Sequence, residues 1–424
     1  MSLERNLEKS VLIVGAGPSG SAAGAMLAKA GIDVQIVDKT DFPRDKICGD
    51  GISPLSLECL RELGIDLGEL DRKYDRQTFV GLVSPGGKRW RAKYEGSPDD
   101  PNSLDYGHVI PRMDFDKMIL DHAVKAGARF APGWSFESLE VEREFVKSVT
   151  LKNADGERVV VKPKILLCAD GEHSLMRKAL TGGEKREHVT LAVRGHVDGL
   201  KNLGQDMEFH FTKEVAPGYG WIFPEGAKDR ANIGVYIHTS TLKKSGISMK
   251  EHYARFLERT GGPGQILEGA NPCGPVQGYP ITYYDPARRV HFGNALLLGD
   301  AAGLADPLTG EGIFEALYSG LAAAHAAQEC LAAGEQGSLA SYMGSLARMY
   351  LPLRRRGFFI MTLLDKMPYL ADWIFTRCAA DPKLSERLFL VVTGNGSAWN
   401  FFSPAVWARI YFPFLYPRAK ELPA

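Results

Sequence analysis

The chain has 424 residues, more than the roughly 250–300 at which a single core usually stops growing, so we expect two domains or one domain with a large insertion. Its 51 Lys and Arg balance 51 Asp and Glu, which leaves no overall field to attract nucleic acid or an anionic membrane. The six cysteines include no CxxC pair, which argues against a disulfide framework or a zinc site. We therefore expect a cytoplasmic protein without a metal centre or a nucleic-acid partner.

The amino-terminal segment does not resemble an export signal. The first ten residues carry charges of both signs and lack the basic start and long apolar stretch of a signal peptide. No later segment has the roughly 18–20 uncharged residues that a membrane-spanning helix requires. An integral membrane protein is therefore not expected.

The first part of the chain alternates between strand and helix patterns. The apolar run at residues 11–14 predicts a buried strand, the Ala-rich stretch at residues 21–30 a helix, and residues 34–37 a second buried strand. Residues 111–128 have the apolar spacing of a helix, and residues 165–167 read as another buried strand. This order predicts an α/β fold with a parallel sheet.

A different pattern follows in the middle of the chain. Between about residues 190 and 237, short segments alternate apolar and polar side chains and predict a mostly antiparallel sheet. Residues 295–298 return to the buried-strand pattern and lead into a long Ala-rich helix over residues 312–333. Strands of the first kind thus lie on both sides of the antiparallel segment, so we expect their domain to be assembled from separate pieces.

A glycine-rich turn lies between the first predicted strand and the first predicted helix. It consists of Gly15, Ala16, Gly17, Pro18, Ser19 and Gly20. In this GxGxxG pattern the glycines permit a tight turn, close backbone approach to a pyrophosphate, and close packing of helix on strand. Asp38 closes the second strand, where its carboxylate can accept from both ribose hydroxyls and disfavours a 2′-phosphate. The pattern predicts a dinucleotide site that does not suit NADP.

Two distant segments identify the dinucleotide. Residues 167–171 and 298–303 each place a Gly and an Asp at the carboxyl end of an apolar strand, where open α/β sheets bind ligands. Together with the glycine-rich turn they resemble the three fingerprints of FAD enzymes with a hydroxylase-like fold. The expected cofactor is therefore FAD.

From residue 11 to residue 333 the sequence resembles the geranylgeranyl reductase family, which includes menaquinone and chlorophyll side-chain reductases. The resemblance rests on FPRDKICGDG at residues 42–51, on PGYGWIFP at residues 217–224 followed by NIG, and on DPLTGEGI at residues 306–313. It implies a p-hydroxybenzoate hydroxylase-type fold, with a Rossmann-like FAD-binding domain, an inserted antiparallel substrate domain and a helical carboxyl-terminal region. The FAD-binding domain is expected at residues 1–80, 105–185 and 285–335. The substrate domain is expected at residues 81–104 and 186–284, and the helical carboxyl-terminal region at residues 336–424.

The resemblance also implies roles in FAD binding. Asp300 resembles a ligand of the ribityl chain, Arg112 an arginine that contacts FAD, and Lys46 and Gly49 part of a loop that reaches the isoalloxazine ring. Backbone N–H groups near residues 310–313 would stabilise negative charge on reduced flavin. Taken alone, an Arg at a helix start is usually a surface group, and loop glycines can simply cap a helix. The complete set expected to bind FAD is Gly15, Ala16, Gly17, Pro18, Ser19, Gly20, Asp38, Lys39, Lys46, Cys48, Gly49, Arg112, Asp170, Gly171, Asp300, Gly310, Gly312 and Ile313.

Cys48 is the candidate catalytic residue. Saturation of an alkene requires a hydride from N5 of the reduced flavin and a proton for the other alkene carbon. We hypothesise that Cys48 lies beside the flavin and supports or performs the proton step. The alternative is that Cys48, like most free cysteines, is a small buried hydrophobic group.

An aromatic strand is the candidate substrate site. Tyr219, Trp221 and Phe223 alternate along one predicted strand and share a face. Such a stripe is usually part of a core. With Pro224, however, it resembles the substrate-cavity motif of the family, and an apolar wall suits an isoprenoid chain, which has no polar group beyond its head.

The expected activity is reduction of carbon–carbon double bonds in the isoprenoid chain of a lipid or quinone. The alternative is a flavin-dependent monooxygenase or halogenase. Hydroxylase-like enzymes commonly carry His where this chain has Gly303, and halogenases commonly carry WxWxIP where it has YGWIFP at residues 219–224, so both differences favour the reductase. A flavoprotein without catalytic activity is a third class. Because no second GxGxxG follows, the electron donor stays open between NAD(P)H and a carrier protein such as reduced ferredoxin.

Two segments near the carboxyl end predict contact with a membrane. Arg354–Arg356 precede the apolar residues 358–361, and aromatic residues are frequent from Trp407 to Tyr416, followed by Arg418. Basic residues beside exposed apolar ones suit a segment at a lipid surface, although helical core or a homodimer contact would explain them equally well. We expect peripheral association with the inner face of the cell membrane.

Overall fold

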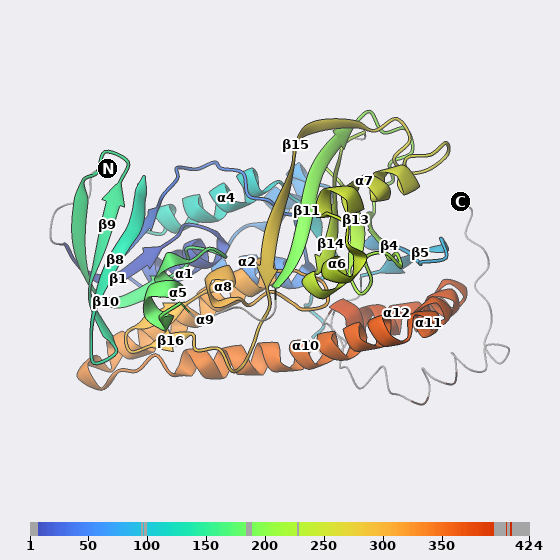
Figure 1. Ribbon diagram of the computed structural model, residues 1–424. Coiled ribbons are helices and arrows are strands. Elements are labelled where there is room, and N and C mark those ends of the chain that lie inside the picture. Colours follow the sequence, from blue (N-terminus) through green and yellow to red (C-terminus); the bar gives the residue numbers. More distant parts are fainter. Residues whose placement is uncertain are drawn as a thin grey trace.

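The computed structural model describes residues 7–94, 96, 100–183, 189–226, 229–393, 404 and 408. Two large sheets lie side by side, and the long helix α10 (Ser341–Lys366) runs along the molecule past both of them (Figure 1). None of the described helices is long and apolar enough to cross a membrane. The mixed α/β fold with carboxyl-terminal helices confirms the fold class expected from the sequence.

The first sheet has a parallel centre, in the order β16-β17-β10-β1-β2-β7, and continues from β10 into the antiparallel strands β9 and β8. Its strands are β1 Leu7–Val14, β2 Val34–Asp38, β7 Arg129–Pro132, β8 Trp134–Glu142, β9 Phe145–Asn153, β10 Arg158–Cys168, β16 His291–Phe292 and β17 Ala295–Leu297. Residues 11–14 are fully enclosed because the sheet is covered on both faces. Strand β1 begins earlier than its apolar run because residues 7–9 pair with residues 161–163 of β10.

Small residues let the helices of this region approach closely. Helix α1 (Pro18–Lys29) packs between α4 (Arg112–Lys125) and α9 (Ile313–Ala332). A Cβ atom at Gly320 of α9 would lie 2.3 Å from the carbonyl oxygen of Ser19, so the backbone of α9 rests directly on the first turn of α1. The Ala-rich sequence of both helices is what permits this contact.

The second sheet is antiparallel except for the parallel pair β12 and β4, in the order β15-β11-β14-β13-β12-β4-β5. Its strands are β4 Phe79–Val83, β5 Arg89–Lys93, β11 Val189–Asp198, β12 Met207–His210, β13 Tyr219–Pro224, β14 Ala231–His238 and β15 Asn271–Thr282. One face packs on helix α7 (Met249–Thr260) through apolar side chains such as Ile233 and Phe256. The other face carries an aromatic cluster that includes Trp221.

The remaining elements connect or flank the two sheets. They are the strands β3 Gly51–Ile52 and β6 His108–Val109, which pair with each other, and the helices α2 Pro54–Leu63, α3 Leu67–Lys73, α5 Leu175–Thr181, α6 Thr239–Ser245, α8 Gly299–Ala302, α11 Pro368–Ala380 and α12 Pro382–Thr393, with a 3-10 turn at Gly334–Gln336. Helices α11 and α12 pack against β5 at the far end of the second sheet (Figure 1). The domain boundaries expected from the sequence stay a prediction.

Candidate flavin and substrate site

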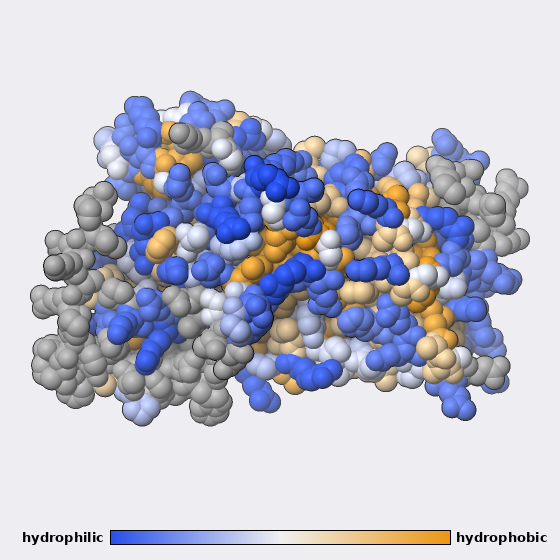
Figure 2. All heavy atoms as spheres, turned by 180° about the vertical axis from the view of Figure 1, so that it is seen from behind, coloured by the Kyte–Doolittle hydropathy of each residue, from blue (hydrophilic) through white to orange (hydrophobic). Residues whose placement is uncertain are grey.

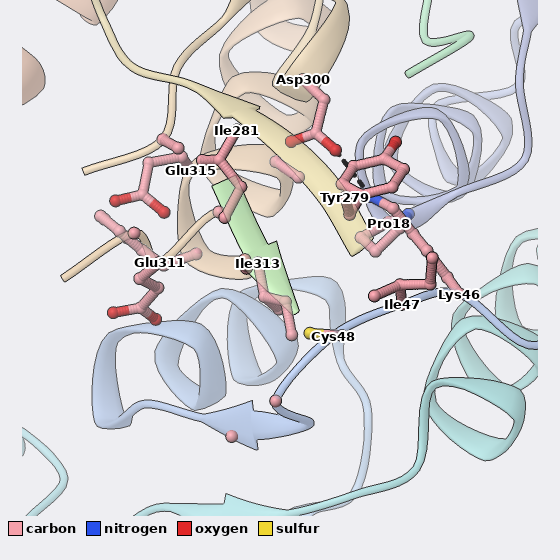
Figure 3. Close-up of a pocket in the computed structure, with 18 of the residues that line it drawn as sticks. Pro18, Lys46, Ile47, Cys48, Tyr279, Ile281, Asp300, Glu311, Ile313 and Glu315 are labelled. Atoms are coloured by element: carbon pink, nitrogen blue, oxygen red, sulfur yellow. Dashed lines mark hydrogen bonds and ion pairs between the residues drawn. The ribbon is translucent and has the colours of Figure 1, made fainter. Parts of the chain in front are cut away.

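A continuous cavity of about 840 Å³ runs between the two sheets, from the glycine-rich turn to the aromatic face of the second sheet. Its volume is in the range of ligand pockets, about 300–1,000 Å³. In Figure 3, Lys46, Asp300 and Tyr279 lie on one side of this cavity and Glu311 and Glu315 on the other. Among the described residues, no group of three or more His, Cys, Asp or Glu side chains could hold a metal ion.

The glycine-rich turn is shaped to admit a phosphate group. Gly15 has a φ of +108°, and a Cβ there would lie 2.1 Å from the carbonyl oxygen of Ala169, so only glycine fits. At Gly17, which precedes α1, a Cβ would have no atom nearer than the Arg44 guanidinium at 3.6 Å. The turn is therefore open toward the cavity, where the amino terminus of α1 favours negative charge.

Asp38 is held in place by the turn itself. One carboxylate oxygen accepts from the backbone N–H of Ala16 at 2.8 Å, and the other accepts from the backbone N–H and the hydroxyl of Thr40 at 3.0 and 2.9 Å. A carboxylate has about four acceptor positions, so Asp38 keeps capacity for a ribose hydroxyl while it fixes the conformation of the turn.

An ion pair joins the loop after β2 to the strand end at β17. Lys46 Nζ lies 2.6 Å from Asp300 Oδ2 and 5.4 Å from the centre of the Tyr279 ring. Burial alone would raise the pKa of Asp300, but the charges of Lys46 and Arg112 outweigh burial and lower it. The carboxylate is therefore ionised beside the cavity and available to accept hydrogen bonds.

Arg112 is buried in a network with two neighbours. Its side chain is 3% exposed and donates to both oxygens of Asp116 at 2.7 Å, which excludes the role of a solvated surface group. Arg44 lies 3.2 Å from the same carboxylate and contacts the ring of Phe42. Arg44 is thus a second cation near the glycine-rich turn. Apart from its place in the FPRDK string, nothing in the sequence indicated that Arg44 would lie there.

Cys48 lies where the two halves of the cavity meet. Its side chain is half-buried and points toward Ile313 at the start of α9 (Figure 3). Burial raises the pKa of the thiol, although the sulfur interacts with the Arg112 side chain and the backbone N–H of Asp50. Gly312, which precedes α9, lies close to Asp300, because a Cβ at Gly312 would be 3.4 Å from Asp300 Oδ1.

The aromatic face of the second sheet forms the other half of the cavity. Phe209 packs edge-on against Tyr219 and Phe223, with ring centres 5.2 and 5.1 Å apart. Trp221 donates from Nε1 to the side chain of Asn232 at 3.0 Å. A Cβ at Gly234 would lie 2.1 Å from the Trp221 ring, so this glycine makes room for the indole. The wall is apolar, and the one polar group of the Trp221 side chain, its indole N–H, has a hydrogen-bond partner.

Comparison with known proteins agrees with this geometry. A family model described as an FAD binding domain matches residues 8–343. Menaquinone reductase of Mycobacterium tuberculosis is 33% identical over 329 residues, covering 74% of this chain and 75% of that protein. Digeranylgeranylglycerophospholipid reductase of Methanosarcina mazei is 29% identical over 330 residues, covering 77% and 76%.

The chain belongs to the geranylgeranyl reductase family of FAD-dependent oxidoreductases. A solved structure of a geranylgeranyl bacteriochlorophyll reductase-like protein from Thermoplasma acidophilum has a TM-score of 0.79 at 22% identity, covering 95% of this chain and 98% of that one. The flavin-dependent brominase Bmp2 has a TM-score of 0.70 at 20% identity, covering 91% and 94%. Both show a shared fold, and the fold by itself does not separate reductases from halogenases.

The structure of this geranylgeranyl reductase homologue brings nearly all the expected site residues to one cavity. Only Ala16, Gly20 and Pro224 of the expected set do not line it. Ala16 is buried below the turn, and a Cβ at Gly20 would lie 1.9 Å from the carbonyl oxygen of Gly15, so Gly20 serves helix packing. Pro224 ends strand β13. The open glycine-rich turn and the ionised Asp300 carboxylate suit the pyrophosphate and the hydroxyl groups of FAD.

The sequence interpretation missed an acidic side of the cavity. Glu311 and Glu315 lie together there (Figure 3), and burial raises the pKa of Glu311 to about 7 and that of Glu315 above its usual range. Arg356 of α10 is 6% exposed and lies 3.2 Å from Asp306. Arg356 is therefore buried in the cavity wall, whereas its place in the run Arg354–Arg356 had suggested a basic residue exposed at a lipid surface.

Loss of the Lys46 charge should make stability depend differently on pH. In wild type the lowered pKa of Asp300 contributes stability above the unfolded carboxylate pKa, about 3.9, and this is lost as pH falls. In Lys46→Met, burial raises that pKa, so the neutral-pH protein carries a poorly compensated carboxylate. We expect K46M to lose about 1–3 kcal/mol near neutral pH, with a difference from wild type that shrinks toward about pH 3.

The measurement is the thermal midpoint and FAD retention of both proteins across this pH range. Lys73→Met is the matched control, because Lys73 forms an exposed pair with Asp114 at 3.0 Å, and such pairs contribute less than about 1 kcal/mol. Equal losses in K46M and K73M at neutral pH would contradict a special role for the Lys46–Asp300 pair.

Proposed function

We propose that this protein saturates carbon–carbon double bonds in the isoprenoid chain of a lipid or quinone. The observation that carries the proposal is the continuity of the cavity: the residues that suit FAD and the aromatic wall of β13 line one space. A chain lying against Trp221 and Phe223 would reach the loop at Cys48 without passing through solvent. The names of the relatives support the same class of substrate, a menaquinone or a digeranylgeranyl lipid.

The residues of the chain divide into three proposed roles. Reduced FAD, when bound, supplies a hydride from N5. Lys46, Asp300 and Arg112 would hold the cofactor, and the backbone N–H groups at Gly312 and Ile313 would stabilise negative charge at the start of α9. The aromatic wall would bind the chain and exclude water, which strengthens every polar interaction within the cavity. The electron donor is NAD(P)H or a carrier such as reduced ferredoxin.

Reduction of a polyprenyl substrate tests the function directly. The anaerobically reduced protein is mixed with a menaquinone or a geranylgeranyl lipid, and we expect flavin reoxidation together with a product heavier by two hydrogens for each double bond saturated. Mass spectrometry identifies the product. The alternative, a monooxygenase or halogenase, requires oxygen, so oxygen uptake coupled to an oxygenated or halogenated product and no anaerobic reaction would reject the reductase.

Cys48 is proposed to support or perform the proton step. Its thiol is protonated at neutral pH because burial raises its pKa, and it lies beside Arg112. Replacement of Cys48 by Ala should slow anaerobic single-turnover oxidation of the reduced flavin by an alkene, by up to about 100-fold if the thiol itself transfers the proton. Cys330→Ala is the control, because Cys330 is a half-buried cysteine of α9 that does not line the cavity. An unchanged rate in C48A would remove Cys48 from the mechanism.

Peripheral membrane contact is proposed because the substrate class partitions into lipid. Of the Arg354–Arg356 run, only Arg355 is exposed, since Arg354 bonds the carbonyl of Tyr284 and Arg356 is buried. Phe359 on the same helix is 41% exposed. Hydrophobic residues also gather in a band on the face shown in Figure 2. The aromatic segment from residue 407 to residue 418 lies outside the described part, apart from residue 408.

Liposome co-sedimentation tests this contact. We expect the full chain to sediment with vesicles that contain anionic lipid. The double variant Arg355→Glu, Phe359→Ser should bind more weakly, because it removes one basic and one apolar group that a lipid surface attracts. Truncation after residue 393 tests the tail separately. No sedimentation by the full chain would count against membrane association, and equal sedimentation of all three proteins would exclude Arg355, Phe359 and the tail as its basis.

A further inference from the structure

We propose that Asp50, rather than the Cys48 thiol, is the acid that delivers the proton to the alkene, a catalytic residue additional to those expected from the sequence, and that Cys48 only supports this step. The proposal rests on the reductase function above and concerns the same cavity. It depends on where the loop places Asp50, on the hydrogen bonds that hold one of its oxygens, and on the free position of the other.

The loop that carries Asp50 lies directly on the aromatic wall. A Cβ at Gly49 would be 3.3 Å from Trp221 Nε1 and 3.2 Å from the Phe223 ring, and a Cβ at Gly51 would be 3.2 Å from the same ring. Glycines on both sides therefore let the backbone touch the wall proposed to bind substrate. Asp50 itself lines the cavity, is 2% exposed and has a φ of +64°, a conformation that Asp and Asn tolerate better than most residues.

Asn232 fixes one oxygen of Asp50. The buried Asn232 side chain donates from Nδ2 to Asp50 Oδ2 at 2.9 Å and to the Cys48 carbonyl at 2.8 Å, and its Oδ1 accepts from Trp221. Both amide protons of Asn232 are thus used, and its orientation is determined by Trp221. Asp50 Oδ1 is buried and has no hydrogen-bond partner among the described residues. A buried polar atom without a partner is costly, and a proton on this oxygen removes its negative charge.

The surroundings hold a proton on Asp50 near neutral pH. Burial raises the pKa of Asp50 to about 7, and the charge of Glu225 after β13 adds to the rise. Arg194 of β11 and Arg112 of α4 oppose it, as does the hydrogen bond from Asn232. Arg194 is itself 2.7 Å from Asp45, so its charge is shared. An acid whose pKa is close to the operating pH is the most effective donor.

The other acids of the cavity are less well matched. Burial raises the pKa of the Cys48 thiol above its usual range, and the Cys48 sulfur already interacts with Arg112 and the N–H of Asp50. The Tyr219 hydroxyl donates to the carbonyl of Thr309, and burial raises its pKa as well. Glu311 has a similar pKa to Asp50, but it lies on the acidic side of the cavity with Ser56 rather than on the aromatic wall.

The proposed step balances in atoms and charge. The π bond of the alkene breaks, one carbon forms a C–H bond with the hydride that the reduced cofactor supplies, and the other forms a C–H bond with the proton of Asp50. The carboxylate left behind keeps the hydrogen bond from Asn232 and lies within the field of Arg194 and Arg112. It regains a proton from solvent before the next turnover.

Asp50→Asn is the decisive variant, because Asn has the same shape, tolerates the positive φ and cannot donate an acidic proton. We expect alkene-dependent oxidation of the reduced flavin to slow by about 100-fold or more in D50N. The wild-type rate should fall as pH rises above about 7, when Asp50 loses its proton, and D50N should lack this decline. Asp41→Asn is the control, since Asp41 is an exposed acid of the same loop that does not line the cavity.

A second measurement does not depend on turnover. Infrared difference spectra between the FAD-loaded wild type and D50N, recorded over about pH 5 to 9, should contain a protonated carboxyl band that disappears near pH 7. Absence of that band, a wild-type rate in D50N, or the same decline with pH in D50N would each overturn the assignment of Asp50. Failure of the wild type to reduce any polyprenyl substrate would instead overturn the reductase function, with the infrared titration still reporting whether Asp50 holds a proton.

Discussion

The arrangement of the whole site depends on how the loop over residues 39–53 is held between the two sheets. On one side the ion pair from Lys46 to Asp300 connects it to the carboxyl end of β17. On the other side Asn232 of β14 connects it through the Cys48 carbonyl and the Asp50 side chain. Because both connections are buried or face the cavity, neither is exchanged easily for water. The loop therefore fixes the distance between the glycine-rich turn and the aromatic wall of the cavity.

The sequence predicted those parts of the fold that depend on local pattern. Residues 11–14 and 295–298 are apolar without interruption because the parallel sheet is covered on both faces. The glycines of the turn at residues 15–20 indicate a helix packed closely on a strand. The aromatic side chains on one face of β13 could also be predicted from the sequence, because side chains alternate between the two faces of a strand. These features need no knowledge of what lies opposite them.

The features that the sequence could not predict all depend on a distant partner. Arg356 stands in a run of three arginines, and only the contact with Asp306, 50 residues earlier, distinguishes it from its neighbours. Asp50 lies within the string FPRDKICGDG, yet nothing in that string shows that Asn232 will bind one oxygen and leave the other free. Burial also decides the protonation of Glu311, and burial is a property of the folded chain.

The carboxyl-terminal helices enclose the end of the cavity that lies farthest from the glycine-rich turn. Phe375 of α11 packs against Trp90 and Phe211, and Phe389 of α12 packs against Tyr94. The family match ends at residue 343, before both helices. An isoprenoid chain bound as proposed would therefore meet, at this end of the cavity, a part of the protein outside the region that the family model matches. If that binding holds, a change in these two helices would alter the accepted chain length without touching the glycine-rich turn or the Lys46–Asp300 pair.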